Sequence, residues 1–260
     1  MITINNYVKV KSLEEAFELN QKKANRIVGG MMWLRMSKGR MQTAIDLSEL
    51  GLDTIEETEE EFKIGCMCTL RRLELHEGLN RYFNQAVKDS VRHIVGTQFR
   101  NQATVGGSIF GRFGFSDVLT CLLVLDTYVE LYKGGIVPLC EFVNMERDSD
   151  ILVRLIIKKD GRKAVYLSER MSSTDFPILA CAVAVKKGTA YISLGARPMK
   201  AELFVSGERV TEENAEVIAA KAAKAVSFSS NMRGSAEYRE HLAKVLAKRG
   251  LLTLLKGACR

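Results

Sequence analysis

The placement of glycine constrains this chain more than any other feature of its sequence. Residues 100–126 read RNQATVGGSIFGRFGFSDVLTCLLVLD, with four glycines within nine residues and then an apolar run spaced like a buried helix. Glycine is used in this way where the backbone turns sharply or approaches another group closely. An isolated glycine pair is most often an irregular turn, but a second pair, Gly29-Gly30, follows a short strand pattern near the start of the chain. Two such loops can face one ligand.

The composition is that of a soluble protein with room for one large domain or two modest ones. The chain has 260 residues, 47% of them hydrophobic, and a formal net charge of +7 that would suit an anionic partner. Its six cysteines are spread through apolar surroundings and suggest no disulfide framework. Asn5, Asn6 and Lys9 interrupt any signal-peptide core, and no apolar run reaches the roughly 18 residues of a membrane helix. We therefore expect a cytoplasmic protein with no membrane partner.

The first 50 residues follow a strand–helix–strand–loop–strand order. A strand pattern occupies residues 2–10, and Ser12 with Glu15 three positions later predicts a capping box and a helix. Residues 25–28 read as a strand that runs into the first glycine pair, and residues 43–47 read as the next strand. This order is typical of a small βαβ-type unit.

The rest of the chain is dominated by strand patterns that come in pairs around turn residues. The pairs are 54–58 with 62–65, 128–131 with 136–139, 151–157 with 164–167, and 178–185 with 190–194. The third pair surrounds Lys159-Asp160-Gly161, which predicts a tight β-hairpin. An alanine-rich helix capped by Thr211 and a long amphipathic helix from Ser235 end the chain. We place a boundary near residue 160, with subdomains 1–52 and 53–160 before it and a domain of residues 161–260 after it.

Both glycine loops have the chemistry of an anion site. Consecutive backbone N–H groups in a glycine turn can converge on a phosphate oxygen, and Gly29-Gly30 and Gly106-Gly107 both offer such a nest. Arg35, Lys38 and Arg40 follow the first loop and could neutralise a diphosphate, while Thr104 and Ser108 place hydroxyls beside the second. The alternative for the first loop is that Met31, Met32 and Trp33 simply pack inward as core.

Asp117 begins the apolar run after the second loop. A carboxylate at the start of a helix is most often a partner of the helix dipole, and the functional alternative is an acceptor for a ribose diol. The loops do not form a Rossmann fingerprint, because Gly107, Gly111 and Gly114 have the wrong spacing for one.

No catalytic or metal-binding residues are predicted. His76, His93 and His241 are isolated, the cysteines lack the clustered spacing of a zinc or iron–sulfur site, and no nucleophile–base pair is present. Residues 221–260 hold nine Lys or Arg against two Glu, which a solvated helix face explains adequately. Without a recognised motif or interleaved aromatic residues, this basic segment is poor support for nucleic-acid binding.

Three marks together make the whole chain resemble the FAD-binding medium subunit of the molybdenum hydroxylases, a family that includes xanthine dehydrogenase and carbon monoxide dehydrogenase. The first mark is VGG at 28–30 with IDLSEL at 45–50. The second is RNQATVGGSI at 100–109, with Asp117 ten residues past the glycine pair and LLVLDTYVEL at 122–131. The third is RGSAEYREHLAKVLAKRGL at 233–251.

The resemblance implies an α+β fold. It would have a two-subdomain FAD-binding region of the vanillyl-alcohol-oxidase/PCMH type over residues 1–160, followed by an antiparallel sheet-and-helix flavoprotein C-terminal domain over 161–260. FAD is the implied cofactor. The residues implied to bind it are Val28, Gly29, Gly30, Met31, Met32, Trp33 and Leu34 at the diphosphate, Thr104, Gly106, Gly107 and Ser108 beside the flavin and phosphate, Asp117 at the ribose, and Leu152 and Val153 against the isoalloxazine.

Several side chains depart from the family pattern. Met31, Met32 and Trp33 stand where the family usually places a hydroxyl or amide directly after the glycines. The segment after the second pair carries Ser108, Phe110, Arg112, Phe113 and Phe115 in place of an asparagine, small residues and a proline, and Leu167 stands in the place of a common lysine.

Two hypotheses follow from the resemblance. In the first, the chain is a flavoprotein subunit that receives electrons from iron–sulfur clusters on a partner and passes them to NAD+ or another acceptor. A molybdopterin-binding subunit and a 2Fe–2S subunit are then the expected partners, and the oxidoreductase works only with them. In the second, the chain is a degenerate, non-catalytic homologue that serves assembly or interaction.

Overall fold

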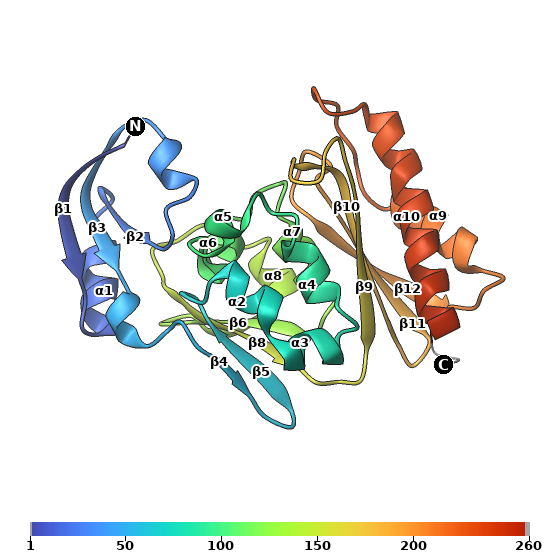
Figure 1. Ribbon diagram of the computed structural model, residues 1–260, viewed down its shortest axis with the longest axis horizontal. Coiled ribbons are helices and arrows are strands. Elements are labelled where there is room, and N and C mark those ends of the chain that lie inside the picture. The colour runs from blue at the N-terminus through green and yellow to red at the C-terminus, as the bar shows by residue number, and fades with distance from the viewer. Residues whose placement is uncertain (1, 258–260) are drawn as a thin grey trace. The chain divides into compact units, whose positions relative to one another are not determined.

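The computed structural model describes residues 2–257, and in this range the strands form three sheets of three, five and four strands. The chain divides into two compact units that each draw on several segments. The first unit comprises Met1–Arg72, Thr97–Gly111 and Thr127–Ile157, and the second comprises Leu73–Gly96, Arg112–Asp126 and Lys158–Arg260. Figure 1 shows the order of the elements along the chain.

The three-stranded sheet of the first unit confirms the predicted βαβ-type order. Its strands β1 (Thr3–Lys9), β2 (Asn25–Val28) and β3 (Arg40–Asp46) are parallel and lie in the order β1-β3-β2, with α1 (Leu13–Asn20) between β1 and β2 in the chain. The capping box is also confirmed, because Ser12 Oγ accepts from the amide of Glu15 at 3.1 Å and the Glu15 carboxylate accepts from the amide of Lys11 at 2.8 Å.

The five-stranded sheet of the first unit has the order β4-β5-β8-β6-β7. Two predicted hairpins supply most of it and are confirmed, because β4 pairs with β5 and β6 pairs with β7, both antiparallel. Its strands are β4 (Ile55–Glu57), β5 (Glu61–Gly65), β6 (Thr127–Leu131), β7 (Gly135–Pro138) and β8 (Leu152–Lys158). The short helices α5 (Thr97–Arg100), α6 (Val105–Phe110) and α8 (Leu139–Phe142) belong to the same unit, and α2 (Leu70–Leu75) follows β5.

The predicted hairpin around Asp160-Gly161 is wrong. Strand β8 pairs with β6, whereas the next strand, β9 (Lys163–Arg170), pairs with β10 (Pro177–Lys186) in another sheet. The turn is held by its own contacts instead. The Asp160 carboxylate accepts from Arg162 Nη2 and Lys186 Nζ, each at 2.7 Å, and the amide of Gly161 donates to the Tyr82 hydroxyl at 2.8 Å. An Asp-Gly pair therefore predicts the position of a turn but not which strands pair on either side of it.

The second unit is built on a four-stranded antiparallel sheet in the order β12-β11-β10-β9. Strands β11 (Thr189–Gly195) and β12 (Glu202–Arg209) complete it, and the predicted pairing of β10 with β11 is confirmed. The helices α9 (Ala215–Lys224) and α10 (Ala236–Gly257) cover one face with a core that includes Val183, Ile192 and Leu246. Both lie on the same side of the sheet in Figure 1.

The opposite face of this sheet carries small side chains and receives helices from earlier in the chain. The second unit also holds α3 (Glu77–Tyr82), α4 (Ala86–Val91) and α7 (Asp117–Leu122), and α4 and α7 contact β9, β10 and β11. A β-carbon on Gly195 would lie 2.0 Å from Thr120 Oγ1, so α7 approaches the sheet as closely as the backbone allows. Strand β10 is buried on both faces, which explains its nearly continuous apolar sequence.

Among the helices of residues 2–257, none combines the length and the apolar character that crossing a membrane would require.

A test of the sheet-and-helix packing uses Gly250, where α10 touches β10. A β-carbon at Gly250 would lie 2.6 Å from Val183 Cγ2, so Gly250→Leu should overpack this contact and lower the free energy of unfolding by about 1–3 kcal/mol in urea titrations. Gly257→Leu is the control on the same helix, because no atom of the described residues lies within 4 Å of its β-carbon position. Equal stability of the two variants would contradict the close packing of α10.

Candidate functional site

The two glycine loops lie directly against each other within the first unit. Loop one is residues 28–34, between β2 and β3, and loop two is residues 104–108, at the start of α6. A β-carbon on Gly29 would lie 2.4 Å from Thr104 Oγ1, and one on Gly30 would lie 1.8 Å from the carbonyl oxygen of Gln102. Only glycine fits at either position, because any side chain would collide with loop two or the residues just before it. The expectation that the two loops face one place therefore agrees with the geometry.

Loop one presents open backbone donors. Within residues 2–257, the amides of Gly30, Met31 and Met32 donate to no protein acceptor. Met31 has φ 55°, a left-handed conformation that is uncommon outside glycine, and its carbonyl accepts from the amide of Arg35 at 3.1 Å. Successive N–H groups around a left-handed residue form the concavity that binds anions in many proteins. Loop one therefore has the backbone of an anion nest.

The side chains of loop one pack against the protein. This agrees with the alternative interpretation, in which Met31, Met32 and Trp33 form part of the core. Val28 and Met32 are buried, while Met31 and Leu34 pack against the small core cluster of Val28, Met41 and Ala44. Trp33 meets Phe99 edge to face, with ring centroids 5.8 Å apart. The two interpretations of loop one are thus compatible, because its side chains form core while its amides stay open.

Loop two does not form the open amide nest that its glycine pair predicted. It is the first turn of α6, and Thr104 caps this helix by accepting from the amide of Gly107 at 3.2 Å. The amides of Val105 and Gly106 donate to the carbonyls of Cys68 and Cys66, each at 2.8 Å. The prediction of free donors at Gly106-Gly107 is therefore wrong, because neighbouring backbone already satisfies them.

The two glycines of loop two serve different purposes. A β-carbon on Gly106 would lie 2.7 Å from the Cys66 carbonyl oxygen, so this glycine permits close packing. Gly107 is exposed, and outside its own helix backbone Thr104 Oγ1, at 3.2 Å, is the one atom of residues 2–257 within 4 Å of its β-carbon position. Next to it, Ser108 donates its hydroxyl to the Thr104 carbonyl at 3.1 Å. Gly107 thus leaves a surface without a side chain beside loop one.

Leu152 and Val153 lie in β8, where both side chains are buried. The Val153 carbonyl accepts from the amide of Cys66 at 2.9 Å, so the strand is joined through Cys66 to loop two. Cys66 and Gln102 are the residues that sequence reasoning missed. Their part in the site is played by backbone carbonyls, which every residue has, and no side-chain motif could have indicated them.

Asp117, in the second unit, is already engaged by protein groups. Its side chain is buried, accepts from Arg170 Nη2 at 2.5 Å and accepts from the Tyr166 hydroxyl. Burial raises the pKa of Asp117 to about 6, and the nearby Arg170 guanidinium and the Tyr166 hydroxyl oppose that rise. The carboxylate forms a buried ion pair with the Arg170 guanidinium.

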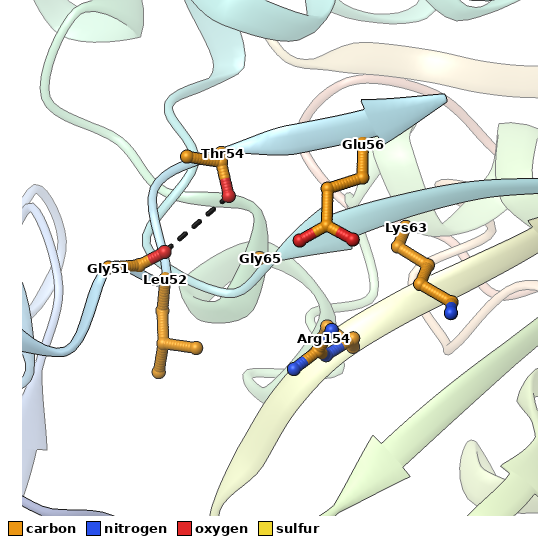
Figure 2. A pocket seen from close by; sticks show the side chains of 7 residues that line it. All are labelled: Gly51, Leu52, Thr54, Glu56, Lys63, Gly65 and Arg154. Atoms are coloured by element: carbon orange, nitrogen blue, oxygen red, sulfur yellow. Dashed lines mark hydrogen bonds between the residues drawn. The ribbon is translucent and has the colours of Figure 1, made fainter. Parts of the chain in front are cut away.

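A separate pocket lies in the first unit at the edge of the five-stranded sheet (Figure 2). Including the open space at its mouth it spans about 240 Å³, and it is lined by Gly51, Leu52, Thr54, Glu56, Lys63, Gly65 and Arg154. Its two cations have protein partners, because Lys63 Nζ lies 3.2 Å from Glu61 Oε1 and Arg154 Nε lies 3.0 Å from Glu130 Oε2. No residue of loop one or loop two lines this pocket.

Two of the histidines that the structure describes have local roles. His76 caps α3 by accepting from the amide of Leu79 at 3.1 Å, and His93 lies 3.3 Å from the Ser173 hydroxyl. Within residues 2–257, no three His, Cys, Asp or Glu side chains come together in a way that could hold a metal ion.

Comparison with known proteins identifies the family. Residues 3–159 match the FAD binding domain in molybdopterin dehydrogenase, and residues 164–254 match the CO dehydrogenase flavoprotein C-terminal domain. The glyceraldehyde dehydrogenase medium chain of Sulfolobus acidocaldarius is 25% identical over 92% of this chain and 94% of that protein. The nicotine 6-hydroxylase medium subunit of Paenarthrobacter nicotinovorans is 24% identical over 95% of each.

Solved structures show the same fold. A chain of the reconstituted CO dehydrogenase from Oligotropha carboxidovorans superposes with a TM-score of 0.86 at 21% identity, covering 98% of both chains. The match to the FAD binding domain in molybdopterin dehydrogenase covers more than half of the sequence and establishes to which family the chain belongs. The chain belongs to the family of FAD-binding domains of molybdopterin dehydrogenases, carries the flavoprotein C-terminal domain of CO dehydrogenase, and has FAD as its cofactor.

Proposed function

We propose that this chain is the FAD-binding electron-transfer subunit of a xanthine dehydrogenase-like molybdenum hydroxylase. In this role it takes electrons from the iron–sulfur clusters of a partner and passes them to NAD+ or another acceptor. The observation that carries the proposal is the contact between loop one and loop two, which leaves three consecutive amides open beside a bare glycine surface. FAD supplies the redox chemistry when bound, and the protein supplies binding and orientation.

The residues of the first unit suit the two halves of such a cofactor. The amides of Gly30, Met31 and Met32 would donate to the diphosphate, and they replace the side-chain donors that this chain lacks after its glycines. Arg35, Lys38 and Arg40 are exposed on the segment that follows and would add positive charge near that anion. Thr104, Gly107 and Ser108 would line the next part of the cofactor, where Gly107 allows close approach. Leu152 and Val153 would support the isoalloxazine side from β8.

The proposed partners are a molybdopterin-binding subunit and a 2Fe–2S subunit. The two curated relatives are described as a medium chain and a medium subunit, which supports a place in a larger assembly. Residues 2–257 hold no cluster of metal-binding side chains, so the proposal assigns the iron–sulfur clusters to partner chains. The subunit would then show its oxidoreductase activity only with those partners.

Flavin content tests the proposal most simply. Purified protein should be yellow and should release about one FAD per chain on denaturation, measured by absorbance against the protein concentration. Colourless protein that also fails to bind added FAD would overturn the proposal and favour the degenerate, non-catalytic homologue.

Gly30→Ala tests the contact between the loops. The new methyl group would collide with the Gln102 carbonyl, so we expect a loss of about 1–3 kcal/mol in the unfolding free energy of the FAD-free protein, together with loss of FAD. Gly207→Ala, in the exposed part of β12, is the matched control because no atom of the described part of the chain lies within 4 Å of its β-carbon position. Wild-type stability in Gly30→Ala would show that the loops do not touch as described.

Gly107→Val tests the bare surface of loop two. Because Gly107 is exposed and has one near neighbour, the variant should keep the stability of the FAD-free protein within about 1 kcal/mol but lose bound FAD. Gly207→Val is the matched control and should retain FAD. Unchanged flavin content in Gly107→Val would remove loop two from the cofactor site.

A further inference from the structure

Residues 20–45 of the first unit carry positive charge without any acid. The segment contains no Asp or Glu, and its cations are Lys22, Lys23, Arg26, Arg35, Lys38 and Arg40. All six side chains are exposed, and within residues 2–257 none of them forms an ion pair or a side-chain hydrogen bond. Their number nearly equals the formal net charge of the whole chain, +7, so much of the positive excess of this protein lies in one segment.

Backbone contacts bring distant parts of this segment to one edge of the three-stranded sheet. The Ala24 carbonyl, just before β2, accepts from the amide of Gln42 in β3 at 2.8 Å. The Gly39 carbonyl, just before β3, accepts from the amide of Thr3 at the start of β1 at 3.0 Å. The chain therefore enters all three strands at the same edge. The cations at this edge are Lys22, Lys23, Lys38 and Arg40.

The short 3-10 helix η1 (Leu34–Met36) adds an exposed apolar side chain to the segment. Backbone and side-chain bonds fix this turn, because the amide of Met36 donates to the Trp33 carbonyl at 3.1 Å and the Ser37 hydroxyl donates to the Leu34 carbonyl at 2.7 Å. Leu34 packs against buried residues of the first unit, whereas Met36 is 69% exposed. The fixed turn thus presents Met36 to solvent among cations.

Acids elsewhere in the first 52 residues do not balance this charge. Asp46, at the end of β3, accepts from the Tyr7 hydroxyl, and Glu49 faces Lys9 at 3.8 Å. In the described part of the chain, no acid of α1 forms an ion pair with any of the six cations. The positive charge is therefore available to a partner.

An acidic protein fits these features better than a nucleic acid does. Protein interfaces are enriched in Met and Arg, and opposite charges around the contact steer the two partners together. Proteins that hold single-stranded nucleic acid add aromatic side chains on which bases stack. The one aromatic residue of residues 20–45 is Trp33, which already meets Phe99 edge to face.

We propose that the six cations and Met36 form a docking surface for an acidic protein that places an apolar side chain against Met36. We call these seven residues the cationic surface. The amide of Arg35 donates to the Met31 carbonyl at 3.1 Å, so the cationic surface is continuous with loop one. The inference concerns association with a protein and stands whether or not loop one holds FAD.

The test uses two fluorescently labelled polymers as probes, titrated by anisotropy. Poly-L-glutamate presents carboxylates alone, and a glutamate–tyrosine copolymer of the same charge adds apolar side chains. Wild-type protein should bind both probes, less tightly as salt screens the charges, and should bind the copolymer more tightly than poly-L-glutamate.

Charge reversal tests the cationic part of the surface. The triple variant Lys22→Glu, Lys23→Glu, Arg26→Glu should bind both probes at least about tenfold more weakly, because three attractions become repulsions. The matched control is a triple variant with the same change of charge at exposed positions of the second unit, Lys224→Glu, Arg249→Glu, Lys256→Glu. The control should stay within about twofold of wild type. Equal losses in the two triple variants would overturn the proposal, because binding would then follow net charge alone.

Met36→Gln tests the apolar part of the surface at nearly constant size and charge. This variant should bind poly-L-glutamate as wild type does but lose the preference for the copolymer. A preference that persists in Met36→Gln would contradict an apolar contact at this residue. Duplex DNA that binds more tightly than both polymers at the same salt, and loses this binding in the first triple variant, would assign the surface to nucleic acid and overturn the proposal.

Flavin content keeps this result separate from the proposed function. None of Lys22, Lys23 and Arg26 has a place in the proposed cofactor site, so their triple variant should keep the FAD content and the urea midpoint of wild type. If wild-type protein binds no FAD, the proposed function fails while the polymer titrations still decide whether the cationic surface docks an acidic protein.

Discussion

Contact between two stretches of backbone organises the first unit of this protein. Gly30 sits against the Gln102 carbonyl and Gly29 against the Thr104 side chain, at separations where a β-carbon has no room. Gly106 makes a similar close contact with the Cys66 carbonyl. Each glycine lets the chain approach a segment about 40 to 75 residues away in sequence. A side chain in its place would have to displace backbone at Gly30 and Gly106, and the Thr104 side chain at Gly29. Within residues 2–257 the amides of Gly30, Met31 and Met32 have no protein acceptor beside this contact, and these are the donors that the proposed cofactor site would use.

The two loops differ in which of their groups remain available to a ligand. In loop one the side chains are taken up in core contacts and the amides remain open, so recognition of an anion would rest on backbone alone. In loop two the amides are taken up by Cys66 and Cys68, and the exposed feature is the bare surface at Gly107. In the proposed site the donors to the anion are backbone amides, so Met31, Met32 and Trp33 can follow the glycines without loss of those donors.

Local patterns predicted much of the fold, and the errors fall where distant segments meet. The capping box of Ser12 and Glu15 and the hairpin of β10 and β11 join residues that are close in sequence, and both form as expected. The hairpin predicted around Asp160-Gly161 is wrong because the residues of a turn do not determine in which sheet the strands on either side of it pair. The prediction of free amides at Gly106 is wrong for a similar reason. The carbonyls of Cys66 and Cys68 accept from the amides of Gly106 and Val105, and these cysteines lie in a segment with no motif. The membership of the family was identifiable from the spacing of the loops, whereas the partners of Asp117 were not.

The structure of the protein with FAD bound is the most direct test of the claim that loop one holds the cofactor through its backbone. The account predicts diphosphate oxygens within hydrogen-bond distance of the amides of Gly30, Met31 and Met32, with the amides of Val105 and Gly106 still bonded to Cys68 and Cys66. A diphosphate held elsewhere, or held by the amides of loop two after they release those carbonyls, would contradict it.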